Sequence, residues 1–131
     1  MNPTRHYAKQ QNETASPERL MVLLFETALR QMRGAVTALE QGRSAEANAP
    51  LTRATDIVAH LDATFDPSRN PELAKHLGAV YRFVCQRLLS GKILNDAVAV
   101  REAERVFFPV ANAFATAVQR LSTERATQAA R

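Results

Sequence analysis

One stretch of this chain, from Thr14 to Leu39, constrains its fold more than any other, because its apolar residues repeat with the period of a helix. The repeat alternates spacings of four and three residues, which places its members on one face of an α-helix. Leu20, Leu23 and Leu24 also make the first two turns apolar on nearly every side, so we expect the start of this helix to be buried on more than one side. The repeat comprises Met21, Phe25, Ala28, Met32, Ala35 and Leu39.

Residues that commonly start and end helices predict four helices, and the first of them contains this repeat. Ser16-Pro17-Glu18 and Asn70-Pro71-Glu72 each combine a side-chain cap, a proline that fits the first helical position and an acidic residue in the first turn. Asn95-Asp96 provides another cap, and Gly42 suits the left-handed residue that follows a helix end. The predicted helices cover residues 17–40, a segment that begins between 45 and 51 and ends before 66, residues 71 to about 90, and residues 96 to about 121.

The connections between these segments are short, which favours antiparallel packing of consecutive helices. The predicted fold class is therefore all-α, an antiparallel up-down-up-down four-helix bundle that covers residues 14–122. Residues 1–13 are predicted to form a loose N-terminal arm, and residues 123–131 a polar tail that frays.

Pro109 breaks the pattern, because it lies inside the fourth predicted helix. It lacks the N–H that would bond to the carbonyl of Arg105, and such a site costs about 3 kcal/mol in a regular helix. We therefore expect a kink near residues 105–109 that is stabilised by burial of the neighbouring apolar side chains. These are Phe107, Phe108 and Val110.

Composition argues against several classes of function. The net charge of +4 is spread along the chain without a basic stripe, so a nucleic-acid partner is not favoured. Cys85 is the only cysteine and fits a reducing cytosol. The N-terminal residues do not resemble a signal peptide, and no apolar run has the length of a membrane span. We expect a soluble, cytoplasmic protein without membrane insertion.

Patterns for catalysis and metal binding are weak. Asp56 and His60 share a helical face, as do Glu72 and His76, and we interpret both pairs as surface charge pairs rather than metal ligands. The Glu-x-x-His pairs of a di-iron bundle, the Cys-x-x-Cys-His of covalent haem and a Gly-rich phosphate loop do not occur. We predict that the protein is not an enzyme and has no cofactor, with a cofactor-bearing bundle as the alternative.

An ordered set of motifs resembles the FliS family of flagellar secretion chaperones. The most specific part is the run Thr14-Ala15-Ser16-Pro17 with an apolar segment after it and Tyr7 upstream. The resemblance covers about residues 7–120. Its further matches are Ala54-x-Asp56-Ile57-Val58-x-x-Leu61, Val80-Tyr81-x-Phe83-x-x-x-Arg87-Leu88 and Val100-x-Glu102-Ala103.

The resemblance implies a cytoplasmic export chaperone. Such a chaperone binds the disordered C-terminal segment of flagellin, prevents its premature polymerisation and keeps it competent for flagellar type III export. The implied partners are this flagellin segment and, as a further candidate, the flagellar export gate. Phe25-Glu26-Thr27 stands where the family often has Tyr-Asp-Gly, so the alternative of a diverged regulatory or interaction protein with a non-flagellin partner stays open.

The predicted client-binding residues are Tyr7, Ile57, Leu61, Tyr81 and Phe83. The last four are positions beside the core-facing repeats, and the alternative is that Leu61 and Tyr81 belong only to the core. We hypothesise that the arm is a removable lid, anchored by Tyr7, over the apolar start of the first helix; the alternative is an exposed Tyr7 without a role. An uncovered apolar patch favours self-association, so a weak homodimer is a further expectation.

Overall fold

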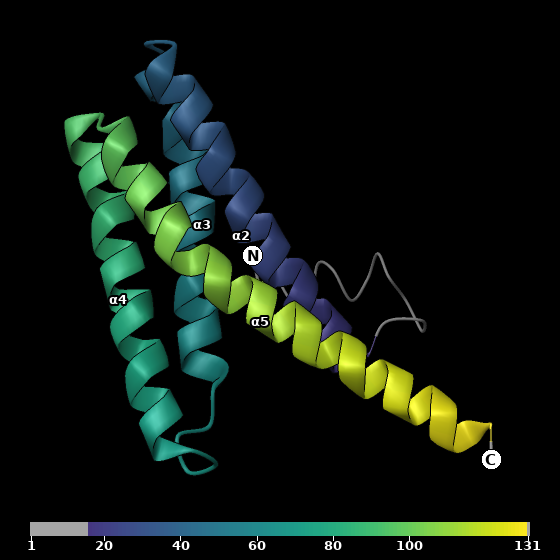
Figure 1. The fold of residues 1–131 in the computed structure, drawn as a ribbon. Coiled ribbons are helices and arrows are strands. Elements are labelled where there is room, and N and C mark those ends of the chain that lie inside the picture. The colour runs from purple at the N-terminus through teal and green to yellow at the C-terminus, as the bar shows by residue number, and fades with distance from the viewer. Residues whose placement is uncertain (1–15, 131) are drawn as a thin grey trace.

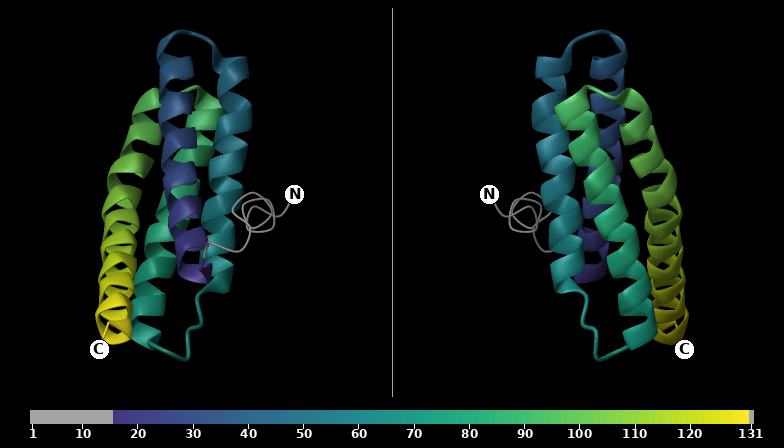
Figure 2. Two further views of the ribbon diagram at one scale, coloured as in Figure 1. Left: turned by 90° about the vertical axis from the view of Figure 1, so that its right-hand side faces the viewer. Right: turned by 90° about the vertical axis from the view of Figure 1, so that its left-hand side faces the viewer.

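The structure of the chain is a computed structural model that describes residues 16–130, and these residues form four α-helices. They are α2 (Pro17–Glu40), α3 (Ser44–Thr64), α4 (Pro71–Leu94) and α5 (Ala97–Ala129). Consecutive helices run in opposite directions, which is consistent with the predicted up-down-up-down order (Figure 1). The α2–α3 and α4–α5 connections lie at one end of the bundle and the α3–α4 connection lies at the other (Figure 2). The prediction of an all-α four-helix bundle is confirmed.

Three helices begin at the caps that the sequence predicted. The Ser16 hydroxyl accepts a hydrogen bond from the backbone N–H of Arg19 at 3.2 Å, and Asn70 Oδ1 accepts one from the N–H of Leu73 at 3.1 Å. The Asp96 carboxylate accepts from two amides in the first turn of α5. These bonds satisfy N–H groups that have no partner inside the helix, so the chain direction is fixed locally at each start.

Three boundaries differ from the prediction, and one of them is the end of α4, which lies at Leu94 instead of near residue 90. Helix α3 begins at Ser44 and includes Pro50, since the packing of its later residues in the core keeps the proline within the helix. Helix α5 continues to Ala129, although residues 123–131 were predicted to fray. Residues 123–129 contain several good helix formers, so α5 extends as a helix of exposed polar residues.

The core lies between the inner faces of all four helices, and each helix contacts two neighbours, in the ring order α2, α3, α4, α5. Its centre is aromatic. The ring of Phe25 in α2 lies 5.4 Å from the ring of Phe107 and 5.1 Å from the ring of Phe114, both in α5. Tyr81 in α4 contacts Phe107 with a centroid distance of 6.4 Å. Phe25 therefore holds α5 against α2 at two points, two turns apart.

Helix α5 stays packed against α2 but diverges from α4. Three ion pairs join α5 to α2, and all of them involve partly exposed side chains, so each contributes about 0–1 kcal/mol and mainly fixes the register. Near the α4–α5 connection Arg87 Nε lies 3.0 Å from Glu102 Oε2, and Gly91 packs against Val100. Beyond this end, α5 slants away from α4 together with α2 (Figure 1). The α2–α5 ion pairs are Glu40–Arg101, Glu104–Arg33 and Glu18–Arg125, at 2.9, 2.6 and 3.6 Å.

Gly91 is predicted to be required for the close approach of α4 and α5. A Cβ at this position would overlap Cγ2 of Val100 and lie 3.3 Å from the backbone oxygen of Asp96. Gly91→Ala should therefore lower the free energy of unfolding by about 1–3 kcal/mol, although alanine favours helix. Chemical denaturation followed by circular dichroism measures this change.

Gly34→Ala is the matched control, because Gly34 also lies inside a helix and a Cβ there meets nothing within 4 Å. This change should raise the free energy of unfolding by about 0.5–1 kcal/mol through helix propensity alone. Equal effects of the two substitutions would contradict the contact between Gly91 and Val100.

Candidate functional site

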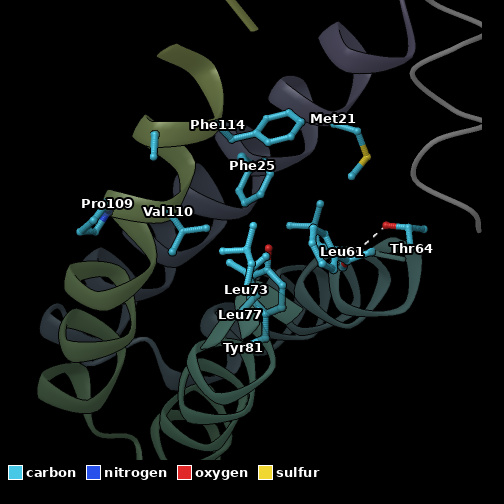
Figure 3. A pocket seen from close by; sticks show the side chains of 12 residues that line it. Met21, Phe25, Leu61, Thr64, Leu73, Leu77, Tyr81, Pro109, Val110 and Phe114 are labelled. Atoms are coloured by element: carbon cyan, nitrogen blue, oxygen red, sulfur yellow. Dashed lines mark hydrogen bonds between the residues drawn. The ribbon is translucent and has the colours of Figure 1, made fainter. Parts of the chain in front are cut away.

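A groove with a volume of about 610 Å³ opens where α5 separates from α4. Residues of α4 and α5 face each other across it, and α2 and the end of α3 contribute the remaining lining (Figure 3). The volume is in the range of pockets that bind ligands of moderate size. The lining residues are Met21, Phe25, Leu61, Thr64, Phe65, Leu73, Leu77, Tyr81, Pro109, Val110, Ala113 and Phe114.

Among residues 16–130, the lining is almost entirely apolar and includes no charged residue. Its two polar side chains are Thr64 and Tyr81, which both carry hydroxyl groups. The Thr64 hydroxyl donates a hydrogen bond to the backbone oxygen of Leu61 at 3.2 Å, and it is drawn with this bond in Figure 3. Such a groove can bury apolar side chains of a partner, but it offers no acid–base pair for catalysis.

Burial is graded across the groove. Leu61 and Tyr81 are 2% and 4% exposed, so they form its deep part. Leu73, in the first turn of α4, is 43% exposed and forms part of its rim. Burial and the negative charge of Asp62 raise the pKa of Tyr81 to about 12, so its hydroxyl stays protonated near neutral pH. A bound segment would therefore meet uncharged, mostly carbon surface from rim to floor.

The structure brings together two of the predicted client-binding residues. Leu61 and Tyr81 belong to the core cluster and also line the groove, so their two interpretations are compatible. Ile57 is 4% exposed within the core and does not line the groove. Phe83 is 39% exposed, and it also does not line the groove. Tyr7 and the arm lie outside the described residues, and binding by any of these five residues stays a prediction.

Several groove residues have the spacing of buried helix faces in the sequence. Leu73, Leu77 and Val110 have the same helical spacing as residues of the core, so their pattern alone could not separate groove from core. Phe65 lies at the end of α3 and continues the repeat of Val58 and Leu61, so its spacing also predicted a buried helix face. Pro109 was the useful signal, because a proline inside a helix marks a departure from regular packing.

Pro109 lies within the continuous helix α5 and lines the groove. The ribbon of α5 is bent rather than straight (Figure 1). Phe107 is fully buried and Val110 is half-buried, as predicted, but the predicted burial of Phe108 is wrong because its side chain is 48% exposed. One residue turns a helix by about 100°, so Phe108 points away from the face that Phe107 directs into the core.

Within residues 16–130 no group of three or more His, Cys, Asp or Glu side chains is placed to hold a metal ion. Among the same residues, no helix combines the length and the apolarity that crossing a membrane requires.

Comparison with known proteins assigns the chain to a family. The family model described as "Flagellar protein FliS" matches residues 1–121. The chain belongs to the FliS family. It is 30% identical over 118 residues to the flagellar secretion chaperone FliS of Bacillus subtilis strain 168, which covers 90% of this chain and 87% of that protein. It is 32% identical over 102 residues to the flagellar secretion chaperone FliS of Salmonella typhimurium strain LT2, which covers 77% and 76% of the two chains.

A further FliS family relative is the flagellar secretion chaperone FliSB of Pseudomonas aeruginosa, which is 28% identical over 96 residues. The match covers 73% of this chain and 76% of that protein. The predicted resemblance to the FliS family is confirmed. The relatives carry the names of chaperones and not of enzymes, in agreement with the predicted absence of enzymatic activity.

Pro109→Ala tests whether the bundle is packed around the bend in α5. Alanine restores the N–H that can bond to Arg105, which favours a straight helix. Phe107 and Phe114 lie on either side of this position and both contact Phe25, so a straighter helix would displace one of these rings. We expect the melting temperature to stay equal to or fall below that of the wild type. A clearly higher melting temperature would show that α5 straightens without loss of packing.

Proposed function

We propose that this FliS family protein is a cytoplasmic export chaperone that binds the disordered C-terminal segment of flagellin in the groove between α4 and α5. Binding would prevent premature polymerisation and keep flagellin competent for flagellar type III export. The observation that carries the proposal is the open apolar groove, which residues 16–130 line without a charged side chain, together with membership of the FliS family.

The groove suits an amphipathic segment better than a small polar molecule. A client segment that folds into a helix on binding presents apolar side chains at intervals of three and four residues, which is the helix-in-groove mode of recognition. Each fully buried aliphatic or aromatic side chain contributes about 1.5–3 kcal/mol before the cost of ordering the segment is subtracted. Several such side chains are therefore needed for stable binding, and a groove of this volume can receive them.

Chaperone action follows from competition for the same apolar surface. A flagellin segment that self-associates in the filament cannot do so while its apolar side chains are buried in the groove. Coupled folding and binding typically buries about 1,000–3,000 Å², and it needs neither a nucleotide nor a catalytic residue. In this proposal release occurs by transfer to the export gate, which would be the second partner of the chaperone.

The first experiment is a pull-down of flagellin from the same bacterium with the full chain. We expect capture of full-length flagellin and loss of capture when its last ~40 residues are removed, a length that corresponds to about 60 Å of helix. Equal capture of the two flagellins would refute the proposed segment. If neither is captured, a non-flagellin client is favoured instead.

The second experiment places a charge on the rim of the groove. Leu73 is the third residue of α4, where an acidic side chain is compatible with the positive end of the helix dipole, so Leu73→Asp should leave the fold intact. Placing a carboxylate against bound apolar side chains should weaken binding of the flagellin segment at least tenfold, about 1.4 kcal/mol or more. Isothermal titration calorimetry measures the affinity.

Val98→Asp is the matched control. Val98 is 52% exposed and lies in the first turn of α5, so the substitution has the same chemistry at a helix start, but Val98 does not line the groove. Its affinity should stay within twofold of the wild type. Equal weakening by the two variants would contradict the groove as the binding site. Phe83→Asp then tests whether the client also covers the surface of α4 outside the groove.

A further inference from the structure

Short side chains form the outer edge of the groove on the side of α5. Pro109 and Ala113, about one helical turn apart, line the groove and are exposed. Val110 and Phe114, which follow them in the sequence, are half-buried and point from α5 into the groove (Figure 3). Phe114 also packs on Phe25 of α2, so these two residues lie deeper than their exposed neighbours. The surface of α5 therefore recedes toward the mouth of the groove.

Ala113 is the smallest of the groove-lining side chains among residues 16–130. The opposite wall carries larger side chains, since Leu73 and Leu77 extend into the groove from α4 (Figure 3). Leu73 is 43% exposed, so the mouth of the groove has a long side chain on one wall and a single methyl group on the other. The space at the mouth therefore lies next to Ala113.

Four lining residues of α5 have the geometry of a hole for a side chain of a second helix. Neighbouring residues on two successive turns of a helix outline such a hole, and a side chain of the facing helix inserts into it. All four residues are apolar, so a charged or amide side chain would lose its hydration there without a partner once the segment covers it. A small apolar side chain would leave part of the hole empty and lose dispersion contacts. The hole consists of Pro109, Val110, Ala113 and Phe114.

We propose that one bulky apolar side chain of the client segment, a Leu, Ile, Met or Phe, inserts into this hole, and that the short side chain of Ala113 provides the room for it. The proposal rests on the proposed function and specifies the segment, which packs as a helix on the groove-facing side of α5 with this side chain at the contact. Ala113 is then a specificity-determining residue. A segment with a small residue at this point would leave a void, and a segment with a charged residue would bury an unpaired charge.

The test uses the full chain and a synthetic peptide of the last ~40 residues of flagellin from the same bacterium, a length chosen as two amphipathic helices. Ala113→Leu fills the hole, so we expect the affinity measured by isothermal titration calorimetry to fall about fivefold or more. The melting temperature of the free protein should be unchanged or higher, because Ala113 is exposed and leucine also favours helix.

Ala126→Leu is the matched control. It is the same substitution at an exposed position of the same helix, but Ala126 does not line the groove. Its affinity for the peptide should stay within about twofold of the wild type. Ala113→Met repeats the test with a more flexible side chain that also fills the hole, and it should weaken binding in the same direction.

Peptide variants identify the inserted side chain. Each Leu, Ile, Met and Phe of the peptide is replaced by Ala, one at a time, and every peptide is titrated against the wild type and Ala113→Leu. At one position we expect the replacement to weaken binding to the wild type but to restore part of the binding to Ala113→Leu, because the leucine side chain takes the space that the peptide has vacated.

The outcomes separate the two proposals. A peptide that fails to bind the wild-type chain refutes the proposed function and this inference with it. Binding of the peptide with equal affinity to the wild type and Ala113→Leu refutes only the inference. A fall in affinity that no shortened side chain of the peptide compensates, or that accompanies a lower melting temperature of Ala113→Leu, shows that the substitution does not act by filling the hole and also refutes the inference.

Discussion

The contact of Phe25 with both Phe107 and Phe114 determines the shape of the molecule, because it holds α5 to α2 on both sides of Pro109. The pair α2–α5 diverges from the pair α3–α4. Helix α5 can therefore pack against only one of its two neighbours along its whole length. The aromatic contacts and the ion pairs favour α2. The space between α4 and α5 is therefore left open, and core-forming residues become accessible there as the lining of the groove.

The groove combines two kinds of interaction that differ in directionality. Burial of apolar surface is non-directional and tolerates many sequences, which suits a partner that is disordered before it binds. A hydrogen bond to the phenol of Tyr81, which lines the groove, is directional, because it forms only with a group in the right place. The side chains of residues 16–130 that line the groove are uncharged, so neither interaction with them is strongly screened by salt. This combination is expected of a protein that holds a segment and later releases it intact.

The sequence was sufficient to predict features that depend on only a few neighbouring residues. The caps at Ser16, Asn70 and Asp96 and the left-handed conformation of Gly42, with φ of 73°, depend on local hydrogen bonds and backbone freedom. The groove was not predictable in this way, because it results from the divergence of whole helices. Leu73 has the spacing of a core residue and is nevertheless 43% exposed, since α5 is not close enough to cover it.

The length of α5 has a mechanical consequence. Its 33 residues correspond to a rod of about 50 Å, and within residues 16–130 the part beyond the groove has ion-pair contact only with α2, through Glu18 and Arg125. A helix that is supported along one side rotates as a unit more easily than it bends. The contact nearest the groove about which α5 could rotate is that between Phe25 and Phe114. A small rotation about this point changes the width of the groove, and the close packing of Gly91 against Val100 at the start of α5 limits how far it can go. In the proposed function, such a movement of one wall would let the groove accept client side chains of different volume.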